Sequence, residues 1–538
     1  MSACPHTTLP VLKKAVPLLL VLLLALASCG GSDGALFMPD IYGNGMVLQR
    51  DVPLTVQGKA VPGESVRVML AGQRRSAVCD SEGCWNVTFA PLSAGGPWTM
   101  TVASHGSRLC FEDVMIGEVW LCSGQSNMEF TLPFSPAYRQ ALDRLQGDTL
   151  QLLQPRTDPS CPLRIYNQRA CYPTDNCRWS HEALAAIRRH DYLSPAVWEG
   201  CTPSSVGDLS AVAYYFGCML QDSLQVPVGL IVNAVGGTPA ESWIDRATLA
   251  DSLPAILDDW LHNPLMQAWC RQRAACNLGI DPNSPDISLQ HHPYEPCYMY
   301  DAGIAPLARY PLRGVIWYQG ESNAHDIATH ARLFPLLVDS WRRTWANPDM
   351  PFLYVQLSSL NRPTWPSFRD SQRRLLDEVP HTGMAVCSDV GDSLDVHPIF
   401  KQPVGERLAR RALADVYGQP WFAVHPSAAG GPLFTSVSFE GSTAVVTFRC
   451  AEGLCTSDGA PLRTFEVADA SGVFHPAVAS IEGDRVVVSS PAVAQPTRVR
   501  YGWQPFTRAN LTNAFGLPAS TFDSAPTLQV DSCSTHFQ

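Results

Sequence analysis

Gly117-Glu-Val-Trp-Leu-Cys-Ser-Gly-Gln-Ser-Asn-Met-Glu129 is the most informative stretch of this 538-residue chain. It begins as an apolar strand and ends in small and polar residues around Gly124. A serine after a glycine turn at the carboxyl end of a strand can present its hydroxyl and its backbone N–H, beside the positive end of a following helix. Ser126 is therefore a candidate nucleophile, although Ser and Asn at such places are also common helix N-caps.

Further apolar runs have the same layout, at residues 228–232, 314–318, 352–355 and 384–386. Helix-like segments such as 209–222 and 404–416 separate them. Buried apolar strands that alternate with helices are typical of a parallel α/β sheet, whose site lies outside the carboxyl ends of the strands. We predict such a core over residues 114–418, with two insertions, at about 133–205 and 250–300, that shape the rim of the site.

The segments on either side of this core predict β structure. Over residues 36–113, short strand-like runs alternate with turns at spacings of about 10 residues, which favours a small β-sandwich. Strand alternation returns over residues 419–538, for example at 444–448 and 485–488, and predicts a second all-β unit.

The composition excludes several classes of protein. Hydrophobic residues make up 46% and charged residues 16% of the chain, which argues against a disordered chain, a coiled coil and a polytopic membrane protein. The net charge of −11 gives no reason to expect nucleic-acid binding, which needs a basic face.

The N-terminus predicts export. Lys13 and Lys14 precede an apolar run over residues 15–27 that is too short to span a membrane, and Leu26-Ala-Ser-Cys29 follows it. We expect residues 1–28 to be a signal peptide and Cys29 to carry a lipid, with ordinary cleavage after a small residue as the alternative. The mature chain would then be a bacterial lipoprotein in the periplasm or on the outer-membrane surface, attached to the membrane only through its lipid.

The cysteines fit an oxidising compartment. Of the 18 cysteines, one leaves with the signal and Cys29 is used by the lipid, so 18 − 2 = 16 remain, and an even number permits disulfides. Two pairs bracket glycine-containing turns and are predicted hairpin disulfides: Cys79 with Cys84, and Cys450 with Cys455. Cys122, on the buried strand before Ser126, is expected to be a free thiol. No paired C-x2-C unit supports a zinc site.

The tips of the other strands carry chemistry too. Gly236 and Gly237 permit close approach of a ligand to the backbone, unless they form a simple turn. Asn323 follows the next apolar run and could donate to an oxyanion, or cap a helix. His397 comes after several aspartates, as a general base with an orienting carboxylate would, although a histidine in a solvent-exposed loop is the plainer reading.

The order Ser, Gly, Asn, His along a parallel sheet resembles the SGNH hydrolases, which share a flavodoxin-like α/β sheet. The motifs are closer still to the sialate O-acetylesterase family, and they cover most of the mature chain. They are the stretch around Ser126, then Val315-Ile-Trp-Tyr-Gln-Gly-Glu-Ser-Asn323, Asp395-Val-His-Pro398 with Lys401-Gln402, Asn44-Gly-Met-Val-Leu-Gln-Arg50, Asn510-Leu-Thr-Asn513 and Gly516-Leu-Pro-Ala519.

This resemblance implies hydrolysis of an acetyl ester on a sugar, with no metal or organic cofactor. Ser126 would attack the acetyl carbonyl while His397 takes its proton. The oxyanion and substrate would be bound by the Ser126 N–H, a glycine N–H and side chains near the strand tips: Gly236 or Gly237, Asn323, Gln125 and Glu321. The implied substrate is an acetylated sugar, first of all sialic acid, with acetylated xylan or another plant glycan as the alternative. The oligomeric state is left open.

The histidine block departs from the family pattern. SGNH enzymes usually carry the acid three residues before the histidine, where this chain has Leu394. We favour Asp395 over Asp392 as the orienting carboxylate. Glu321 and a Ser–His dyad served by a backbone carbonyl stay open, and Glu321 fits better as a buried brace of the loops. A non-catalytic, glycan-binding surface lipoprotein is the remaining reading, which the intact Ser, Asn and His set argues against.

Overall fold

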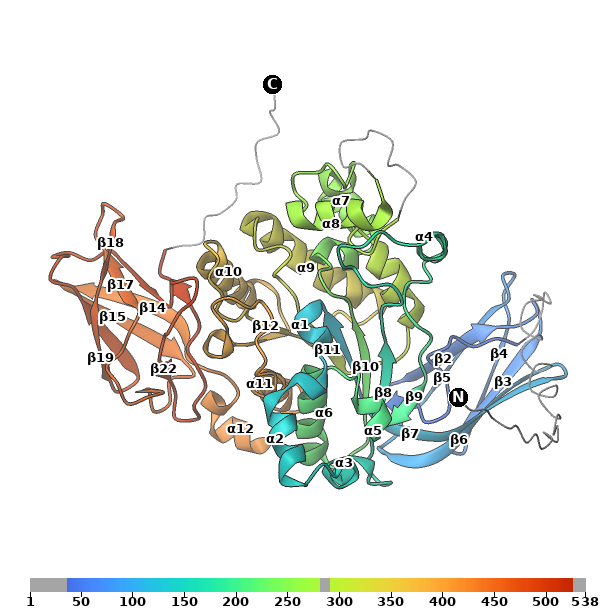
Figure 1. Cartoon of the computed structure of the whole chain (residues 1–538). Coiled ribbons are helices and arrows are strands. Elements are labelled where there is room, and N and C mark those ends of the chain that lie inside the picture. The colour runs from blue at the N-terminus through green and yellow to red at the C-terminus, as the bar shows by residue number, and fades with distance from the viewer. Residues whose placement is uncertain (1–35, 281–290, 526–538) are drawn as a thin grey trace, which may run out of the picture.

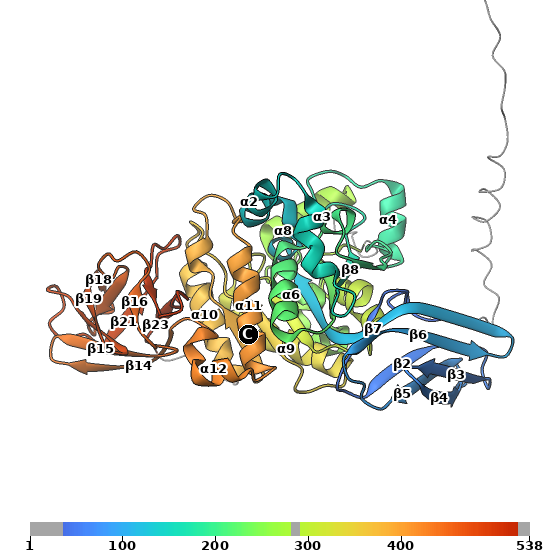
Figure 2. The same ribbon diagram turned by 90° about the horizontal axis from the view of Figure 1, so that it is seen from below.

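The computed structural model describes residues 36–280 and 291–525. The predicted signal peptide over residues 1–28 and the predicted lipid site Cys29 lie outside the described residues. An α/β core occupies the middle of the molecule, with one β unit at each end (Figures 1 and 2). The chain thus has the mixed α/β class that its sequence predicts.

The core is built on a sheet with the strand order β13-β12-β11-β7-β10-β8-β9. All neighbours are parallel except β8 and β9. The strands are β7 (Ser107–Gly124), β8 (Leu163–Gln168), β9 (Trp198–Gly200), β10 (Val228–Ala234), β11 (Gly314–Tyr318), β12 (Phe352–Val355) and β13 (Thr382–Ala385). The chain order reverses on either side of β7, so β7 marks the place where a sheet of this kind forms its site.

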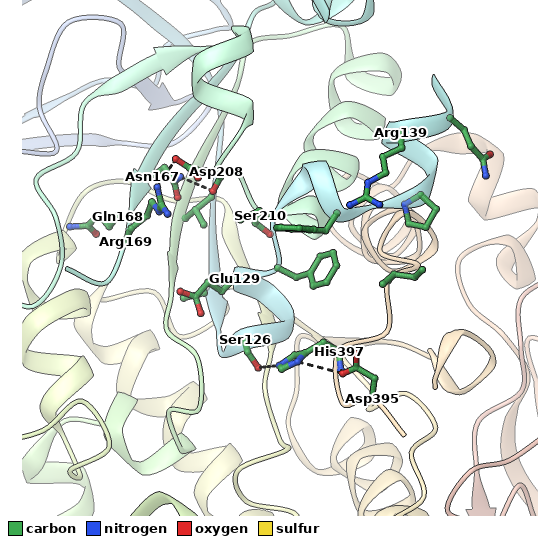
Figure 3. Close-up of a pocket in the computed structure, with 18 residues that line it drawn as sticks. Ser126, Glu129, Arg139, Asn167, Gln168, Arg169, Asp208, Ser210, Asp395 and His397 are labelled. Atoms are coloured by element: carbon green, nitrogen blue, oxygen red, sulfur yellow. Dashed lines mark hydrogen bonds and ion pairs between the residues drawn. The ribbon is translucent and has the colours of Figure 1, made fainter. Parts of the chain in front are cut away.

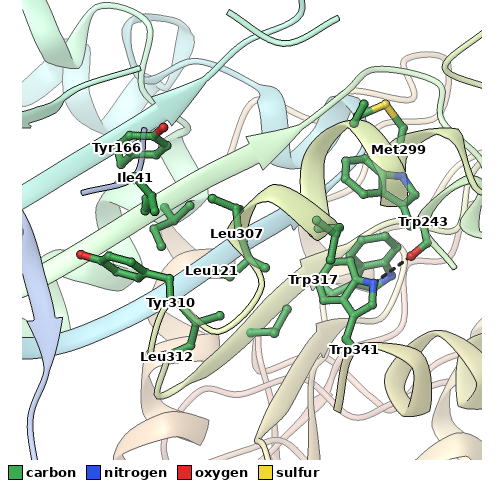
Figure 4. Packing of buried hydrophobic residues seen from close by; sticks show 14 of the residues in the cluster. Ile41, Leu121, Tyr166, Trp243, Met299, Leu307, Tyr310, Leu312, Trp317 and Trp341 are labelled. Carbon is green, nitrogen blue, oxygen red and sulfur yellow. Dashed lines mark hydrogen bonds between the residues drawn. The ribbon is translucent and has the colours of Figure 1, made fainter. Parts of the chain in front are cut away.

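Both faces of this sheet are apolar, because successive side chains of a strand point to opposite faces. In β7, Val119 and Leu121 belong to one hydrophobic cluster, while Trp120 and Cys122 belong to another. The first cluster includes α9 and three tryptophans that meet edge to face (Figure 4): Trp243, Trp317 and Trp341. The second includes α6 and α11. Helices thus cover both faces, which explains the continuous apolar runs in the sequence.

The helices of the chain vary from single turns to 18 residues. They are α1 (Ser126–Glu129), α2 (Pro136–Arg144), α3 (Thr149–Leu153), α4 (His181–Arg188), α5 (Pro203–Val206), α6 (Ala211–Leu224), α7 (Arg246–Ser252), α8 (Ala268–Leu278), α9 (Ile327–Thr344), α10 (Trp365–Glu378), α11 (Gln402–Asp415) and α12 (Pro420–Val424). Helices α6 and α11 correspond to the two helical segments predicted from the sequence. Among the described residues, no helix is long and apolar enough to cross a membrane.

The N-terminal β unit is continuous with the core. Strand β7 pairs with β6 in its first half and with β10 and β11 in its second, so one 11-stranded sheet runs through both parts. The boundary predicted between residues 113 and 114 therefore falls inside a strand. The other strands of this unit are β1 (Val47–Gln49), β2 (Leu54–Lys59), β3 (Ser65–Leu70), β4 (Gln73–Val78), β5 (Cys84–Phe89) and β6 (Gly95–Ser104).

The C-terminal β unit contains two four-stranded antiparallel sheets, β14-β15-β20-β19 and β18-β17-β21-β23, which share one hydrophobic cluster. A small sheet of β16 and β22 accompanies them. The bounds are β14 (Leu433–Glu440), β15 (Thr443–Arg449), β16 (Cys455–Thr456), β17 (Phe465–Ala468), β18 (Phe474–Pro476), β19 (Val478–Glu482), β20 (Arg485–Ser489), β21 (Arg498–Tyr501), β22 (Leu511–Thr512) and β23 (Phe522–Asp523).

The predicted insertion over residues 133–205 is more than a rim. It contains β8, which extends the parallel sheet beside β10, and the short strand β9. The sequence of β8 does not read as a buried run, because Arg164 and Asn167 interrupt it. Arg164 forms an ion pair with Asp113.

The predicted hairpin disulfides are not formed. All 15 cysteines among the described residues are free thiols. At the first hairpin, the Asp80 carboxylate accepts the N–H groups of Glu82 and Cys84, so hydrogen bonds close the turn without a crosslink. At the second, Cys455 Sγ lies 3.3 Å from Thr512 Oγ1, while Cys450 Sγ contacts the carbonyl of Pro426. Cys122 is a buried free thiol, as predicted.

Candidate active site

The nucleophile loop follows β7 directly. Gly124 has φ +141°, and a Cβ atom there would lie 2.1 Å from the carbonyl oxygen of Tyr318, so only glycine fits between β7 and β11. Ser126 then begins helix α1. Its Oγ lies 2.8 Å from Nε2 of His397 (Figure 3). A neutral imidazole would accept the hydroxyl proton at this distance, which is the geometry of a serine activated by a general base.

The carboxylate beside the imidazole is Asp395. Its Oδ1 accepts the backbone N–H of His397 at 2.8 Å and lies 3.6 Å from Nδ1. Asp392 instead accepts the N–H groups of Leu394 and Asp395, so it stabilises the turn of the loop. Glu321 accepts from Asn127, away from the imidazole. The geometry therefore favours Asp395 over Asp392 and Glu321 as the partner of the histidine.

The electrostatic surroundings keep His397 neutral. Partial burial lowers the pKa of the imidazole below its usual value, Asp395 opposes this effect, and the charge of Lys401 adds to it. A histidine with a lowered pKa is unprotonated at neutral pH and free to accept a proton.

The glycine loop after β10 lies beside the nucleophile. A Cβ atom on Gly236 would lie 3.6 Å from Ser126 Cβ and 2.9 Å from a carboxylate oxygen of Glu129. Gly237 has φ +78°, and a Cβ atom there would collide with the hydroxyl of Tyr294. Gly236 therefore lies beside the nucleophile and Gly237 packs against Tyr294, while the approach of a ligand to these glycines stays a prediction.

None of the five residues predicted to bind the oxyanion or the substrate lines the pocket that contains Ser126 and His397: Gly236, Gly237, Asn323, Gln125 and Glu321. Asn323 donates to Glu241 at 2.8 Å, and its oxygen accepts from the Ala240 N–H and from Gln319. Gln125 accepts the N–H groups of two residues after β11, Gly320 and Ser322. Both side chains are buried and brace the loops around the strand ends. Their amides turn back into the loops that carry them, and their roles in binding substrate stay predictions.

Ser126 and His397 lie in a pocket of about 760 Å³. Its apolar lining comes from Phe130, Phe134, Pro136, Val232, Ala234 and Ile399. Its other polar lining comes from Glu129, Thr131, Arg139, Gln140, Asn167, Gln168, Arg169, Asp208, Ser210 and Asp395. Seven of these residues, from Phe134 to Arg169, belong to the aperiodic segment over residues 133–205, where no sequence signal singles them out.

Charged side chains lie on both sides of the nucleophile (Figure 3). Arg169 forms an ion pair with Asp208 at 2.5 Å. Arg139 donates from Nε to the carbonyl of Pro133 and stacks over the ring of Phe134, 5.7 Å from its centroid. Among the described residues, no carboxylate forms an ion pair with Arg139. Burial raises the pKa of Glu129, while a hydrogen bond from the Gly236 backbone and the charge of Arg169 oppose the rise.

Within the described ranges, no group of three or more His, Cys, Asp or Glu side chains is arranged to hold a metal ion. The chemistry that the site does offer is a hydroxyl activated by an imidazole, at the end of the central strand of a parallel sheet. That combination defines a serine hydrolase.

Comparisons with known proteins place the chain within this class. The family described as carbohydrate esterase, sialic acid-specific acetylesterase matches residues 292–414. The sialate O-acetylesterase of Rattus norvegicus is 31% identical over 456 residues, which cover 76% of this chain and 78% of the rat protein. The Mus musculus enzyme of the same name is 30% identical over 447 residues, 75% of this chain and 78% of the mouse protein.

A solved structure is similar over nearly the whole chain. The crystal structure of a novel carbohydrate acetylesterase from Xanthomonas citri has a TM-score of 0.73 and 31% identity, and the match covers 92% of this chain and 100% of that one. The chain therefore belongs to the sialate O-acetylesterase family, as its motifs predict, and it is a carboxylic ester hydrolase.

Proposed function

We propose that this protein removes O-acetyl groups from sialic acid through an acyl-enzyme intermediate. The observation that carries the proposal is the 2.8 Å contact of Ser126 Oγ with His397 Nε2 inside a pocket of sugar-binding size. The names of the rat and mouse relatives support sialic acid as the substrate. The intact Ser–His pair speaks against the non-catalytic glycan-binding alternative.

The proposed reaction has two halves. His397 takes the hydroxyl proton as Ser126 attacks the acetyl carbonyl, and the imidazolium then protonates the departing sugar oxygen. Water, activated by the same histidine, hydrolyses the acetyl-enzyme and releases acetate. The N–H of Ser126 and an N–H of the Gly236-Gly237 turn would stabilise the oxyanion, each worth about 3 kcal/mol of barrier height. Asp395 would stabilise the imidazolium.

An anionic sugar fits the charges of the pocket. Arg169 is already compensated by Asp208, whereas Arg139 is exposed and has no carboxylate partner among the described residues. We therefore assign Arg139 to the sialate carboxylate, which a guanidinium binds through charge-assisted hydrogen bonds. Acetylated xylan, the alternative substrate, is uncharged at its acetylated sugars and would make no use of this arginine.

The substrate assignment can be tested with Arg139→Gln. The variant should raise KM for 9-O-acetylated sialic acid about 10-fold and leave hydrolysis of 4-nitrophenyl acetate unchanged. Arg144→Gln, on the same helix but outside this pocket, is the matched control. Equal effects on both esters, or faster acetate release from acetylated xylan than from the sialate, would favour the plant-glycan alternative.

We also propose the finer fold and the location that the sequence suggests. The core is of the SGNH, flavodoxin-like type, and the two terminal units are β-sandwiches. The chain is exported as a bacterial lipoprotein anchored through Cys29, which the Leu26-Ala-Ser-Cys29 sequence supports. Fatty-acid labelling and membrane fractionation of the full chain should show a lipidated protein that Cys29→Ala converts to an unlabelled one. Persistent labelling of this variant would exclude the anchor.

A further inference from the structure

Three buried polar side chains form a chain behind the nucleophile. Glu321 lies after β11, Asn127 lies in α1, and Lys401 lies just before α11. Their exposed fractions are 5%, 0% and 0%. Asn127 donates from Nδ2 to Glu321, and its oxygen accepts from the Lys401 ammonium. One amide thus connects a buried carboxylate to a buried ammonium.

The same amide holds the loop of the general base. Its Nδ2 also donates to the carbonyl of Val396, at 2.9 Å. Val396 immediately precedes His397, and Asn127 immediately follows Ser126. Both N–H bonds and the oxygen of Asn127 are engaged, so its orientation is fixed by three partners: Glu321 after β11, and Val396 and Lys401 in the segment before α11. The main chain on either side of the Ser126–His397 contact is therefore joined by one side chain.

This arrangement is costly. Burying a carboxylate and an ammonium without direct contact forfeits much of the attraction that would offset their desolvation. Cation–π contacts offset part of the desolvation of Lys401, whose ammonium lies 4.8 Å from the ring centroid of Phe130 and 5.4 Å from that of Tyr318. Glu321 Oε2 is buried without a hydrogen-bond partner within the described part of the chain. Core packing alone would be served better by apolar residues.

We propose that Glu321, Asn127 and Lys401 are positioning residues that hold His397 at hydrogen-bonding distance from Ser126. The proposal rests on the proposed esterase mechanism and assigns these three side chains no contact with substrate. Displacing a catalytic group by as little as 1 Å costs about 100-fold in rate.

The charge of Lys401 also affects the pKa of His397. The ionisable groups around it are Glu321 after β11, Cys387 after β13, and Asp395 and His397 in the loop of the base. Burial lowers the pKa of Lys401 to about 7, which Glu321 opposes, and burial raises the pKa of Glu321. The ammonium in turn helps to lower the pKa of His397. Removing it should move the acidic limb of the pH–rate profile to higher pH.

The test compares two variants on 4-nitrophenyl acetate over the pH range. Lys401→Met should lower kcat about 100-fold, with KM nearly unchanged, and shift the acidic limb upward. Asn127→Ser removes the bond to Val396 but keeps both charges, and should lower kcat without that shift. The control is Gln402→Met, the next residue along, whose amide bonds to Glu406 at the start of α11.

The outcomes separate this proposal from the esterase mechanism. Folded variants with wild-type kcat and an unmoved acidic limb would overturn the positioning role, even if activity still requires Ser126. If Lys401→Met does not fold, Asn127→Ser decides alone, and wild-type kcat there overturns the proposal. Loss of kcat matched by Gln402→Met would mean general loosening of the helix start, which also overturns it.

Discussion

Asp395 interacts only weakly with His397, and the loss of kcat on its replacement by asparagine can be calculated from the structure. Its side chain is 63% exposed, and its Oδ1 lies 3.6 Å from His397 Nδ1, beyond hydrogen-bonding distance. The same oxygen accepts the backbone N–H of His397. An asparagine side chain keeps that acceptor, so Asp395→Asn removes the charge and leaves the loop bond in place.

The magnitude follows from Coulomb's law. Two unit charges about 4 Å apart interact by about 1 kcal/mol in water and by about 4 kcal/mol at an effective dielectric constant of 20. Both Asp395 and His397 are more than one third exposed, so solvent screening places the interaction with the imidazolium near the low end, at about 1 to 2 kcal/mol. At 1.36 kcal/mol per tenfold change, kcat should fall about 5- to 30-fold.

The assay is steady-state release of acetate at pH 7.5, with Asp392→Asn as the control for the loop. A buried triad aspartate costs about 10⁴ in kcat, so the two cases are easily separated. A loss of that size in Asp395→Asn would contradict the weak, solvent-screened interaction and show that the carboxylate closes on the imidazole when substrate binds. An unchanged kcat would leave a Ser–His dyad without carboxylate assistance.

Two further predictions concern proton binding. The value of kcat/KM should rise with pH as His397 loses its proton, at a pKa below the usual value of about 6.5, and should be constant at neutral pH. The reason is that only the neutral imidazole accepts a proton. An acidic limb centred above pH 7 would contradict this prediction. Glu118→Gln should lower the free energy of unfolding at pH 7 by about 3 kcal/mol, because this buried carboxylate pairs with Arg50 at 2.6 Å and Arg313 at 2.8 Å. Burial alone would raise the pKa of Glu118, but the two arginines lower it, so the stabilisation is present at neutral pH and is lost as the pH falls. Urea unfolding of the wild type and the variant at pH 7 and pH 3 should show a smaller difference in the free energy of unfolding at pH 3. An equal difference at both pH values would contradict a stabilising role of the Glu118 charge.

Much of the core follows from the sequence because buried parallel strands need apolar residues on both faces. The runs at 228–232 and 314–318 coincide with β10 and β11 almost residue for residue. Ser126 and His397 could be predicted for a related reason. The carboxyl ends of parallel strands lie at one edge of the sheet, so polar residues that follow different strands come close together. Strand β8 could not be predicted, because its polar residues interrupt the apolar pattern.

The spacing of residues along the sequence does not determine which way a side chain points at the end of a strand. Asn323 and Gln125 lie at the predicted tips, yet their amides satisfy loop N–H groups and a buried glutamate. The residues that line the pocket could not be predicted from the sequence for another reason. Residues such as Arg139 and Arg169 come from segments without periodicity, and only the folded chain brings them beside Ser126.

Whether Ser126 deacetylates sialic acid is measured by acetate release from 9-O-acetylated sialic acid. Wild-type protein and Ser126→Ala, matched by circular dichroism, are assayed side by side. If Ser126 is the nucleophile and sialic acid the substrate, the wild type should release acetate steadily and the variant should be at least about 10⁴-fold slower. Release that survives in Ser126→Ala, or a wild type that leaves this substrate intact while deacetylating xylan, would contradict it.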